Sequence, residues 1–172
     1  SPREQGHADA ARKRFAFEEI FFIQLERQKS RMLYAANPTF TIVPKKEGLE
    51  EFILGLGFPL TKAQRDALDT ILRDFGSSRA MLRLLEGDVG SGKTAVAAAT
   101  TYATVTTRPK GQDYGALQVA YMCPTEILAT QHFESFIKYF IGSGMNIGLI
   151  TGSGCRKFPS KVNPGGWTDI SR

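Results

Sequence analysis

Apolar residues recur at helical spacing between residues 8 and 33 and predict one long amphipathic helix. Charged and polar residues fill the positions between them. The apolar stripe consists of Ala11, Phe15, Phe22 and Leu25, and it is widened by Phe17, Ile20 and Phe21. So many large aromatic side chains are too apolar to leave in water, and we therefore expect this helix to pack against another domain or another chain.

Helix-breaking residues end this pattern. Asn37-Pro38 and Pro44 stop a helix from continuing, so we predict a connector at this point. Beyond it, apolar positions predict two further helices, the second of which opens at Thr61. We therefore separate residues 1–45, a linker helix with its connector, from a second unit that begins at residue 46.

The middle of the chain alternates short apolar runs with longer helical patterns. The predicted strands cover residues 80–86, 116–122 and 146–150, and the predicted helices between them cover residues 93–106 and 126–141. Strands that alternate with helices form a parallel sheet with right-handed crossovers. The predicted fold class is thus α/β with a parallel sheet. Three strands do not complete a doubly wound sheet, so we expect residues 46–153 to be the N-terminal part of one domain.

The last residues follow no periodic pattern. Glycine and proline interrupt residues 154–172, where only Trp167 and Ile170 are suited to anchor the chain. We predict an irregular tail or insertion that is truncated.

Composition and charge narrow the classes of function only slightly. The net charge of +5 and the pI of about 9.3 favour a polyanionic partner, although a solvated surface explains them equally well. The longest strongly apolar run, Ile20 to Ile23, is too short for a membrane span, so we expect no membrane partner. Cys123 and Cys155 form no C-x-x-C pair, and the cytoplasm is the expected compartment.

The most informative motif is an octet that fits G-x-x-x-x-G-K-[ST], the phosphate-binding loop of P-loop nucleotidases. It reads Gly87-Asp88-Val89-Gly90-Ser91-Gly92-Lys93-Thr94. Its glycines let backbone N–H groups point at a polyphosphate, and Lys93 supplies a mobile charge for the β- and γ-phosphates. The Thr94 hydroxyl suits Mg²⁺, and a helix that starts at Lys93 adds its positive dipole end. A predicted strand precedes the octet, and an alanine-rich helix follows it. The motif therefore predicts binding of a nucleoside triphosphate.

Two flanking segments each allow two interpretations. Thr61 and Gln64 fit a capping box that needs no ligand, yet the Gln64 amide has the donor and acceptor that adenine requires. Thr125 suits a helix N-cap, but a helix that starts at the end of a strand is also where a nucleic-acid phosphate docks. The second argument also covers residues 151–153.

Taken together, these motifs resemble RecG, the superfamily 2 ATP-dependent DNA helicase that remodels stalled forks and branched DNA. The matching segments are Phe58-Pro59-Leu60-Thr61-x-Ala63-Gln64, the octet, Pro124-Thr125-Glu126-Ile127-Leu128-Ala129-x-Gln131-His132 and Thr151-Gly152-Ser153. Residues 11–19 are similar to the helix that joins the wedge domain of that family to its motor. The resemblance implies a RecA-like ATP-binding lobe, ATP and Mg²⁺ as cofactors, branched or forked DNA as partner, and a role in DNA repair and recombination.

The resemblance also implies a role for each matching residue. Gln64 is expected to recognise adenine, with Phe58 against the base. Lys93 and Thr94 are expected to be catalytic, with Thr94 as the Mg²⁺ ligand. The nucleotide-binding set is completed by Gly87, Asp88, Val89, Gly90, Ser91 and Gly92, and the DNA-binding set consists of Pro124, Thr125, Gly152 and Ser153.

Departures from the family pattern limit the expected activity. No apolar run ends in Asp-Glu, the pair that holds Mg²⁺ and positions the attacking water, and the second motor lobe and the wedge domain are missing. We therefore expect a fragment that binds ATP–Mg²⁺ without turnover, and whose first helix has lost the parts of the helicase that pack on it. Two alternatives stay open: a translocase of the transcription-repair coupling type, and a nucleotide-binding interaction module that never hydrolyses. A small-molecule kinase fits poorly, because Gln64 precedes the octet at helicase-like spacing.

Overall fold

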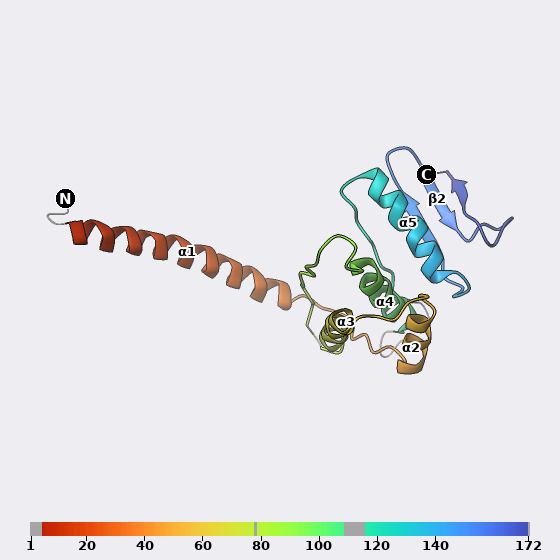
Figure 1. The fold of residues 1–172 in the computed structure, drawn as a ribbon, viewed down its shortest axis with the longest axis horizontal. Helices are drawn as coiled ribbons and strands as arrows, with labels where there is room; N and C mark the ends of the chain where they lie inside the picture. Colours follow the sequence, from red (N-terminus) through yellow and green to blue (C-terminus); the bar gives the residue numbers. More distant parts are fainter. Residues whose placement is uncertain (1–4, 78, 109–115, 172) are drawn as a thin grey trace. The chain divides into compact units, whose positions relative to one another are not determined.

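A computed structural model describes residues 5–77, 79–108 and 116–171 (Figure 1). The helices are α1 (Gln5–Ala35), α2 (Lys46–Leu54), α3 (Lys62–Phe75), α4 (Lys93–Thr106) and α5 (Glu126–Phe140), and the strands are β1 (Ile147–Ile150), β2 (Cys155–Phe158) and β3 (Thr168–Ile170). The chain divides into two compact units. One contains residues 1–40 with 77–82, and the other contains residues 41–76 with 83–172.

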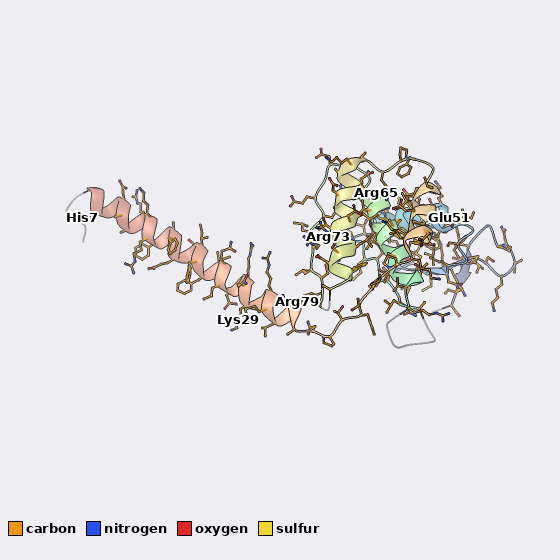
Figure 2. All side chains as sticks on the ribbon, turned by 90° about the horizontal axis from the view of Figure 1, so that it is seen from below. His7, Lys29, Glu51, Arg65, Arg73 and Arg79 are labelled. Carbon is orange, nitrogen blue, oxygen red and sulfur yellow. The ribbon has the colours of Figure 1, made fainter. Side chains whose placement is uncertain are left out.

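The first unit consists mainly of α1. A helix covers the segment where a long amphipathic helix was predicted, and it begins and ends slightly outside the predicted bounds, while its amphipathic character stays a prediction. Its side chains project from all sides of the helix (Figure 2), and none of those described is buried. Phe15 and Phe17 are 70% and 66% exposed, so the packing of an apolar face against a neighbour stays a prediction. Among the described residues, no helix is long and apolar enough to cross a membrane.

The core of the second unit forms around α4. The buried residues of α4 are mostly alanine, and such small side chains let the neighbouring helices α2, α3 and α5 approach closely. Phe52 of α2 stacks on Tyr102 of α4, with ring centroids 4.4 Å apart, and also contacts Phe140 of α5 at 5.0 Å. Leu68 of α3 is 1% exposed in the same cluster. The helix that follows the phosphate loop is therefore held on three sides.

An antiparallel sheet packs against α5. The strands lie in the order β1-β2-β3, with Ile147 opposite Phe158 and Arg156 opposite Asp169. Leu149 and Phe158 from the sheet form a second buried cluster with Phe133 of α5. This packing fixes the turn between β1 and β2 beside the N-terminal end of α5.

The observed sheet differs from the predicted parallel one. Residues 80–86 and 116–122 form neither helix nor strand, and Leu82 and Leu84, which a sheet would bury, are 73% and 81% exposed. A parallel pair requires a crossover that brings distant segments together, whereas β1 and β2 need only a short turn at residues 151–154. The region predicted to be an irregular tail contributes β2 and β3. The predicted domain boundaries stay predictions.

Candidate functional site

The phosphate-loop octet adopts a backbone that only glycine tolerates at several positions. Gly90 and Gly92 have φ angles of 81° and 80°, in the left-handed region. A Cβ atom on Gly87 would lie 2.6 Å from the Ser91 hydroxyl oxygen. The Ser91 N–H donates to the carbonyl of Asp88 at 3.1 Å and closes the turn, while Val89 at its tip is fully exposed. The loop therefore has the tight curvature that a polyphosphate-binding loop requires.

Lys93 and Thr94 begin α4 directly after this loop. The Lys93 ammonium donates to the carbonyl oxygens of Gly87 and Asp88, at 2.5 and 2.7 Å. By their position in the first turn, the N–H groups of Lys93 and Thr94 have no acceptor within the helix. Thr94 is half-buried. The predicted catalytic pair thus lies where a phosphate and its Mg²⁺ would meet the helix N-terminus.

Gln64 joins the start of α3 to the loop. Its Oε1 accepts from the Thr61 N–H at 2.8 Å, and the Thr61 hydroxyl accepts from the Gln64 N–H at 3.3 Å, so the predicted capping box is confirmed. The Gln64 Nε2 also donates to the carbonyl of Ser91 at 2.7 Å. One amide N–H and one lone pair of Gln64 are left for a base. Phe58, predicted to lie against that base, is 42% exposed ahead of α3.

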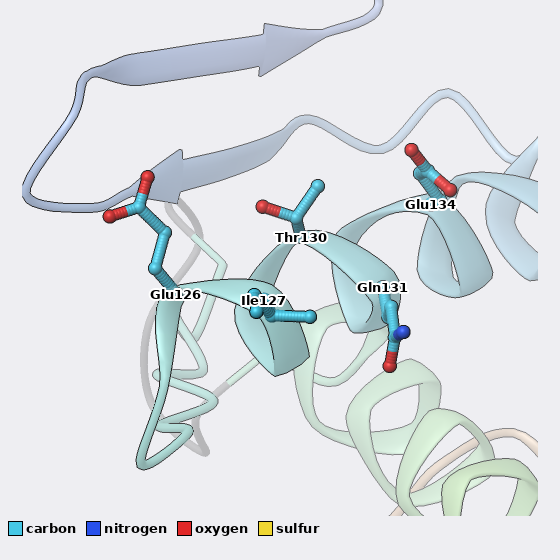
Figure 3. A pocket seen from close by; sticks show the side chains of 5 residues that line it. All are labelled: Glu126, Ile127, Thr130, Gln131 and Glu134. Carbon is cyan, nitrogen blue, oxygen red and sulfur yellow. The ribbon is translucent and has the colours of Figure 1, made fainter.

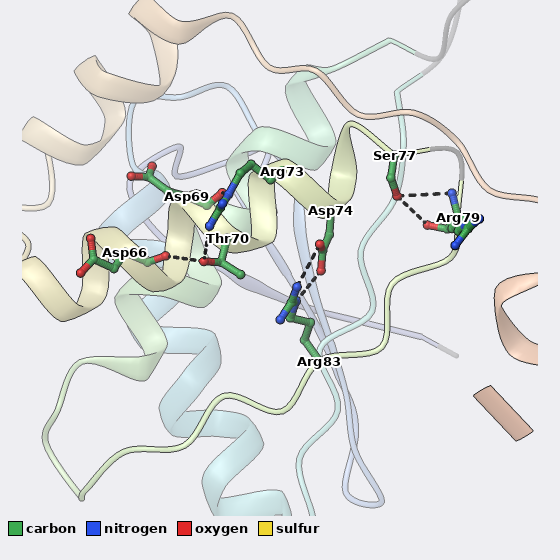
Figure 4. Close-up of polar contacts among 8 residues, drawn as sticks. All are labelled: Asp66, Asp69, Thr70, Arg73, Asp74, Ser77, Arg79 and Arg83. Atoms are coloured by element: carbon green, nitrogen blue, oxygen red, sulfur yellow. Dashed lines mark hydrogen bonds and ion pairs between the residues drawn. The ribbon is translucent and has the colours of Figure 1, made fainter. Parts of the chain in front are cut away.

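An ion pair fixes the segment that enters the loop. Arg83 donates through its Nε and Nη2 atoms to both carboxylate oxygens of Asp74, near the end of α3 (Figure 4), with the Nη2 distance at 3.0 Å. The hydrogen bond from Arg83 lowers the pKa of Asp74. This bidentate pair holds the chain ahead of the loop although no strand forms there.

The four predicted DNA-binding residues lie on two adjacent elements. Pro124 and Thr125 precede α5, where the Thr125 hydroxyl accepts from the Leu128 N–H at 3.3 Å and confirms the predicted N-cap. Gly152 and Ser153 lie in the turn between β1 and β2. The structure therefore brings together segments separated by more than twenty residues. The role of these residues in binding DNA stays a prediction.

Glu126 links these two elements. The Ser153 hydroxyl donates to a carboxylate oxygen of Glu126, which points at the turn between β1 and β2 (Figure 3). This hydrogen bond is the main cause that lowers the pKa of Glu126. The Thr151 hydroxyl lies 3.2 Å from that of Ser153 and donates to the carbonyl of Gly154 at 3.1 Å. The turn is therefore a network of short polar side chains.

A shallow pocket lies along one face of α5 (Figure 3). It is lined by Glu126, Ile127, Thr130, Gln131 and Glu134. Its two carboxylates and the exposed Ile127 make it unsuited to a phosphate. The pocket also contains no residue of the octet. The predicted nucleotide site at the octet is therefore separate from this pocket.

Sequence patterns did not predict several of these contacts. They gave no sign that Lys93 bonds to its own loop, that Arg83 pairs with Asp74, or that Glu126 holds Ser153. One signal was available for the tail: the glycines of residues 152–154 follow an apolar run and precede another strand-length segment, which is typical of a hairpin.

Comparison with known proteins gives a consistent result. The family model described as DEAD/DEAH box helicase matches residues 61–162. The ATP-dependent DNA helicase RecG of Staphylococcus aureus (strain MRSA252) is 40% identical over 153 residues, which are 88% of this chain and 21% of that protein. RecG of Staphylococcus epidermidis (strain ATCC 12228 / FDA PCI 1200) is 42% identical over 144 residues, 83% of this chain and 20% of that protein.

A solved structure also matches. The chain is 38% identical to one described as RecG bound to a three-way DNA junction, with a TM-score of 0.66 over 85% of this chain and 19% of that one. The chain therefore spans about a fifth of the length of the relatives it matches. The resemblance to RecG is confirmed, and the helicase RecA-like fold is supported by this structural neighbour. Because this family model matches more than half of its residues, the chain belongs to the DEAD/DEAH box helicase family.

Proposed function

We propose that this chain is the ATP-binding part of an ATP-dependent DNA helicase that remodels branched DNA and stalled forks in repair and recombination. One observation carries the proposal: the glycine-built loop, the Lys93 ammonium inside it and the Gln64 amide form one connected hydrogen-bonded group. The relatives named ATP-dependent DNA helicase RecG, and the neighbour bound to a three-way junction, support the choice of DNA as partner.

The loop residues fit ATP and Mg²⁺. Gly90 and Gly92 give the loop its left-handed φ angles, and a Cβ atom on Gly87 or Gly92 would collide with the Ser91 or Gln64 side chain, so these positions suit a loop that wraps closely around phosphates. Bound Mg–ATP supplies the phosphoanhydride whose hydrolysis drives a helicase. Lys93 would hold the phosphates through its ammonium in place of its two carbonyl acceptors, and Thr94 would hold Mg²⁺ through its hydroxyl.

Gln64 connects recognition of the base with the phosphate loop. Its free amide N–H and lone pair would bind adenine, while its other N–H stays on the Ser91 carbonyl. Phe58 would lie against the base. An adenine that orients the Gln64 amide therefore also positions the loop through Ser91.

The DNA backbone contacts the group formed by α5 and the turn between β1 and β2. Pro124 and Thr125 present the N-terminal end of α5, whose dipole favours phosphate. Gly152 allows the backbone to approach closely, and Ser153 offers its hydroxyl. Because Ser153 donates its only hydroxyl proton to Glu126, this bond must break before Ser153 can donate to a phosphate.

The chain by itself is proposed to bind ATP–Mg²⁺ weakly without turnover. Its 172 residues contain no Asp-Glu pair to hold Mg²⁺ and orient the attacking water. The exposed phenylalanines of α1 are proposed to pack against another part of the helicase. That exposure is also the observation that favours the second candidate, an interaction module that binds nucleotide and never hydrolyses it.

The test compares the chain with a Lys93→Ala variant by titration of a fluorescent ATP analogue in Mg²⁺. Lys93→Ala should abolish binding, whereas Lys138→Ala, at an exposed position in the last turn of α5, should leave it unchanged. Equal binding by the wild-type chain and Lys93→Ala would exclude the proposed nucleotide site. Phosphate release stimulated by a three-way DNA junction and lost in Lys93→Ala would contradict the absence of turnover.

A further inference from the structure

Arg156 of β2 is held between an aromatic ring and a carboxylate. Its guanidinium carbon lies 4.4 Å from the centre of the Trp167 ring, and its Nε lies 3.5 Å from Asp169 of β3. Asp169 is the residue directly opposite Arg156 in the strand register. An arginine fixed on two sides loses little further freedom when it binds a ligand, which favours tight binding.

This arginine lies next to the proposed DNA-contacting turn. β2 begins directly after residues 151–154, and Arg156 pairs across the sheet with Leu149 of β1. Arg156 is also close enough to Glu126 for its charge to contribute to the lowered pKa of that carboxyl. The guanidinium, Ser153 and the N-terminal end of α5 therefore lie in one region of the second unit.

The ribbon formed by β2 and β3 combines positive charge with an aromatic surface. Residues 151–171 contain three positively charged side chains, Arg156, Lys157 and Lys161, and a single carboxylate, that of Asp169. The Arg156 guanidinium lies over the Trp167 ring. Trp167 is nevertheless 41% exposed, so part of the residue remains accessible to a ligand. Cations beside an exposed aromatic ring are the combination that binds a phosphodiester backbone and stacks on bases.

We propose that the β2–β3 ribbon is a second nucleic-acid contact of this chain, in which Arg156 binds a phosphate of the DNA strand and Trp167 holds the guanidinium in place. The proposal rests on the proposed function, because it extends the DNA surface of Thr125 and Ser153. Arg156 adds a positive charge to this surface, which the turn itself lacks, since residues 151–154 contain no lysine or arginine.

The experiment titrates the full chain against a labelled three-way DNA junction at several salt concentrations. Arg156→Gln should weaken binding on the order of tenfold, as for a lost hydrogen bond to a charged group. It should also reduce the slope of log affinity against log salt by about 0.9, as for one lost phosphate contact. Lys138→Gln removes the same charge at the far end of α5 and should leave the affinity and the slope unchanged.

Trp167 provides an independent signal because it is the only tryptophan of the chain. Its emission should change when DNA binds, and the change should shrink in Arg156→Gln. Arg156→Lys retains the charge and should keep the salt slope, while losing the planar contact with the ring. Circular dichroism and affinity for the ATP analogue confirm that each variant is folded; if Arg156→Gln is not, Arg156→Lys and the Trp167 emission decide.

Each outcome separates this inference from the proposed function. If DNA binds but neither the slope in Arg156→Gln nor the Trp167 emission changes, the ribbon is no DNA contact, while the proposed function stands. If the wild-type chain binds ATP but no DNA at any salt concentration, both the ribbon contact and the DNA part of the proposed function are wrong. A loss of slope in Arg156→Gln with ATP affinity intact supports the ribbon contact.

Discussion

Replacement of Gln64 by glutamate separates two interactions of this side chain, the capping of α3 at Thr61 and the hydrogen bond to Ser91 in the loop. The carboxylate retains an oxygen that accepts from the Thr61 N–H, so the capping box is kept. The other oxygen replaces Nε2 and faces the Ser91 carbonyl, where an acceptor meets an acceptor. The lost hydrogen bond is worth about 1 kcal/mol, and the added negative charge near the triphosphate weakens binding further. We expect affinity for the ATP analogue to fall at least about fivefold.

Gln64→Ala is the matched comparison. It removes the capping interaction as well, at a cost of about 1 kcal/mol to the free energy of unfolding. Urea denaturation followed by circular dichroism should therefore find Gln64→Ala, which loses both the cap and the hydrogen bond to Ser91, less stable than Gln64→Glu, which loses only the hydrogen bond to Ser91. The reasoning is refuted if Gln64→Glu binds the ATP analogue as tightly as the wild type, or if it is as unstable as Gln64→Ala.

Three further predictions follow from the same structure. Gly92→Ala places a Cβ atom against the Gln64 amide and forces a φ angle of 80° on a residue with a side chain. The variant should lose nucleotide binding and at least about 1 kcal/mol of the free energy of unfolding. Retained affinity for the ATP analogue would show that the loop relaxes and would contradict this prediction. The pKa of Glu126 is lowered in the folded chain, so its stabilising effect is present above its ordinary value of 4.5 and is lost as the pH falls below it. In Glu126→Gln, the midpoint of urea denaturation should change less between pH 6 and pH 3 than it does in the wild type. An unchanged pH dependence would count against the hydrogen bond between Glu126 and Ser153. Finally, the exposed α1 should make the chain self-associate at micromolar concentration, and replacing Phe17 and Phe21 by serine should yield a monomer in sedimentation experiments; a monomeric wild-type chain that binds no apolar dye would contradict this.

Local signals in the sequence predicted the helices well. The capping box of Thr61 and Gln64 and the N-cap at Thr125 act within one turn of chain, and both helices begin where these residues predict. The same holds for the octet, because Gly90 and Gly92 need left-handed φ angles whatever surrounds them. Such features depend on a few neighbouring residues and can be derived from them.

Features that depend on distant contacts were predicted less well. The runs at residues 80–86 and 116–122 have the composition of strands, but a strand exists only when another segment pairs with it. Conversely, β2 and β3 form in a segment with weak strand character because β1 provides a nearby partner. The bond between Glu126 and Ser153 joins residues 27 positions apart, so no local pattern contains it.

The contacts of Lys93 have a consequence for selectivity among nucleotides. The carbonyls of Gly87 and Asp88 compete with phosphate for one ammonium, so a ligand must reach that ammonium to displace them. At the proposed nucleotide site, a monophosphate too short to reach the ammonium would leave the loop in its resting arrangement, whereas a longer polyphosphate would exchange acceptors. The length of the ligand's phosphate chain would thereby select between two states of the loop, and the heat released on binding would be smaller than the number of new contacts suggests.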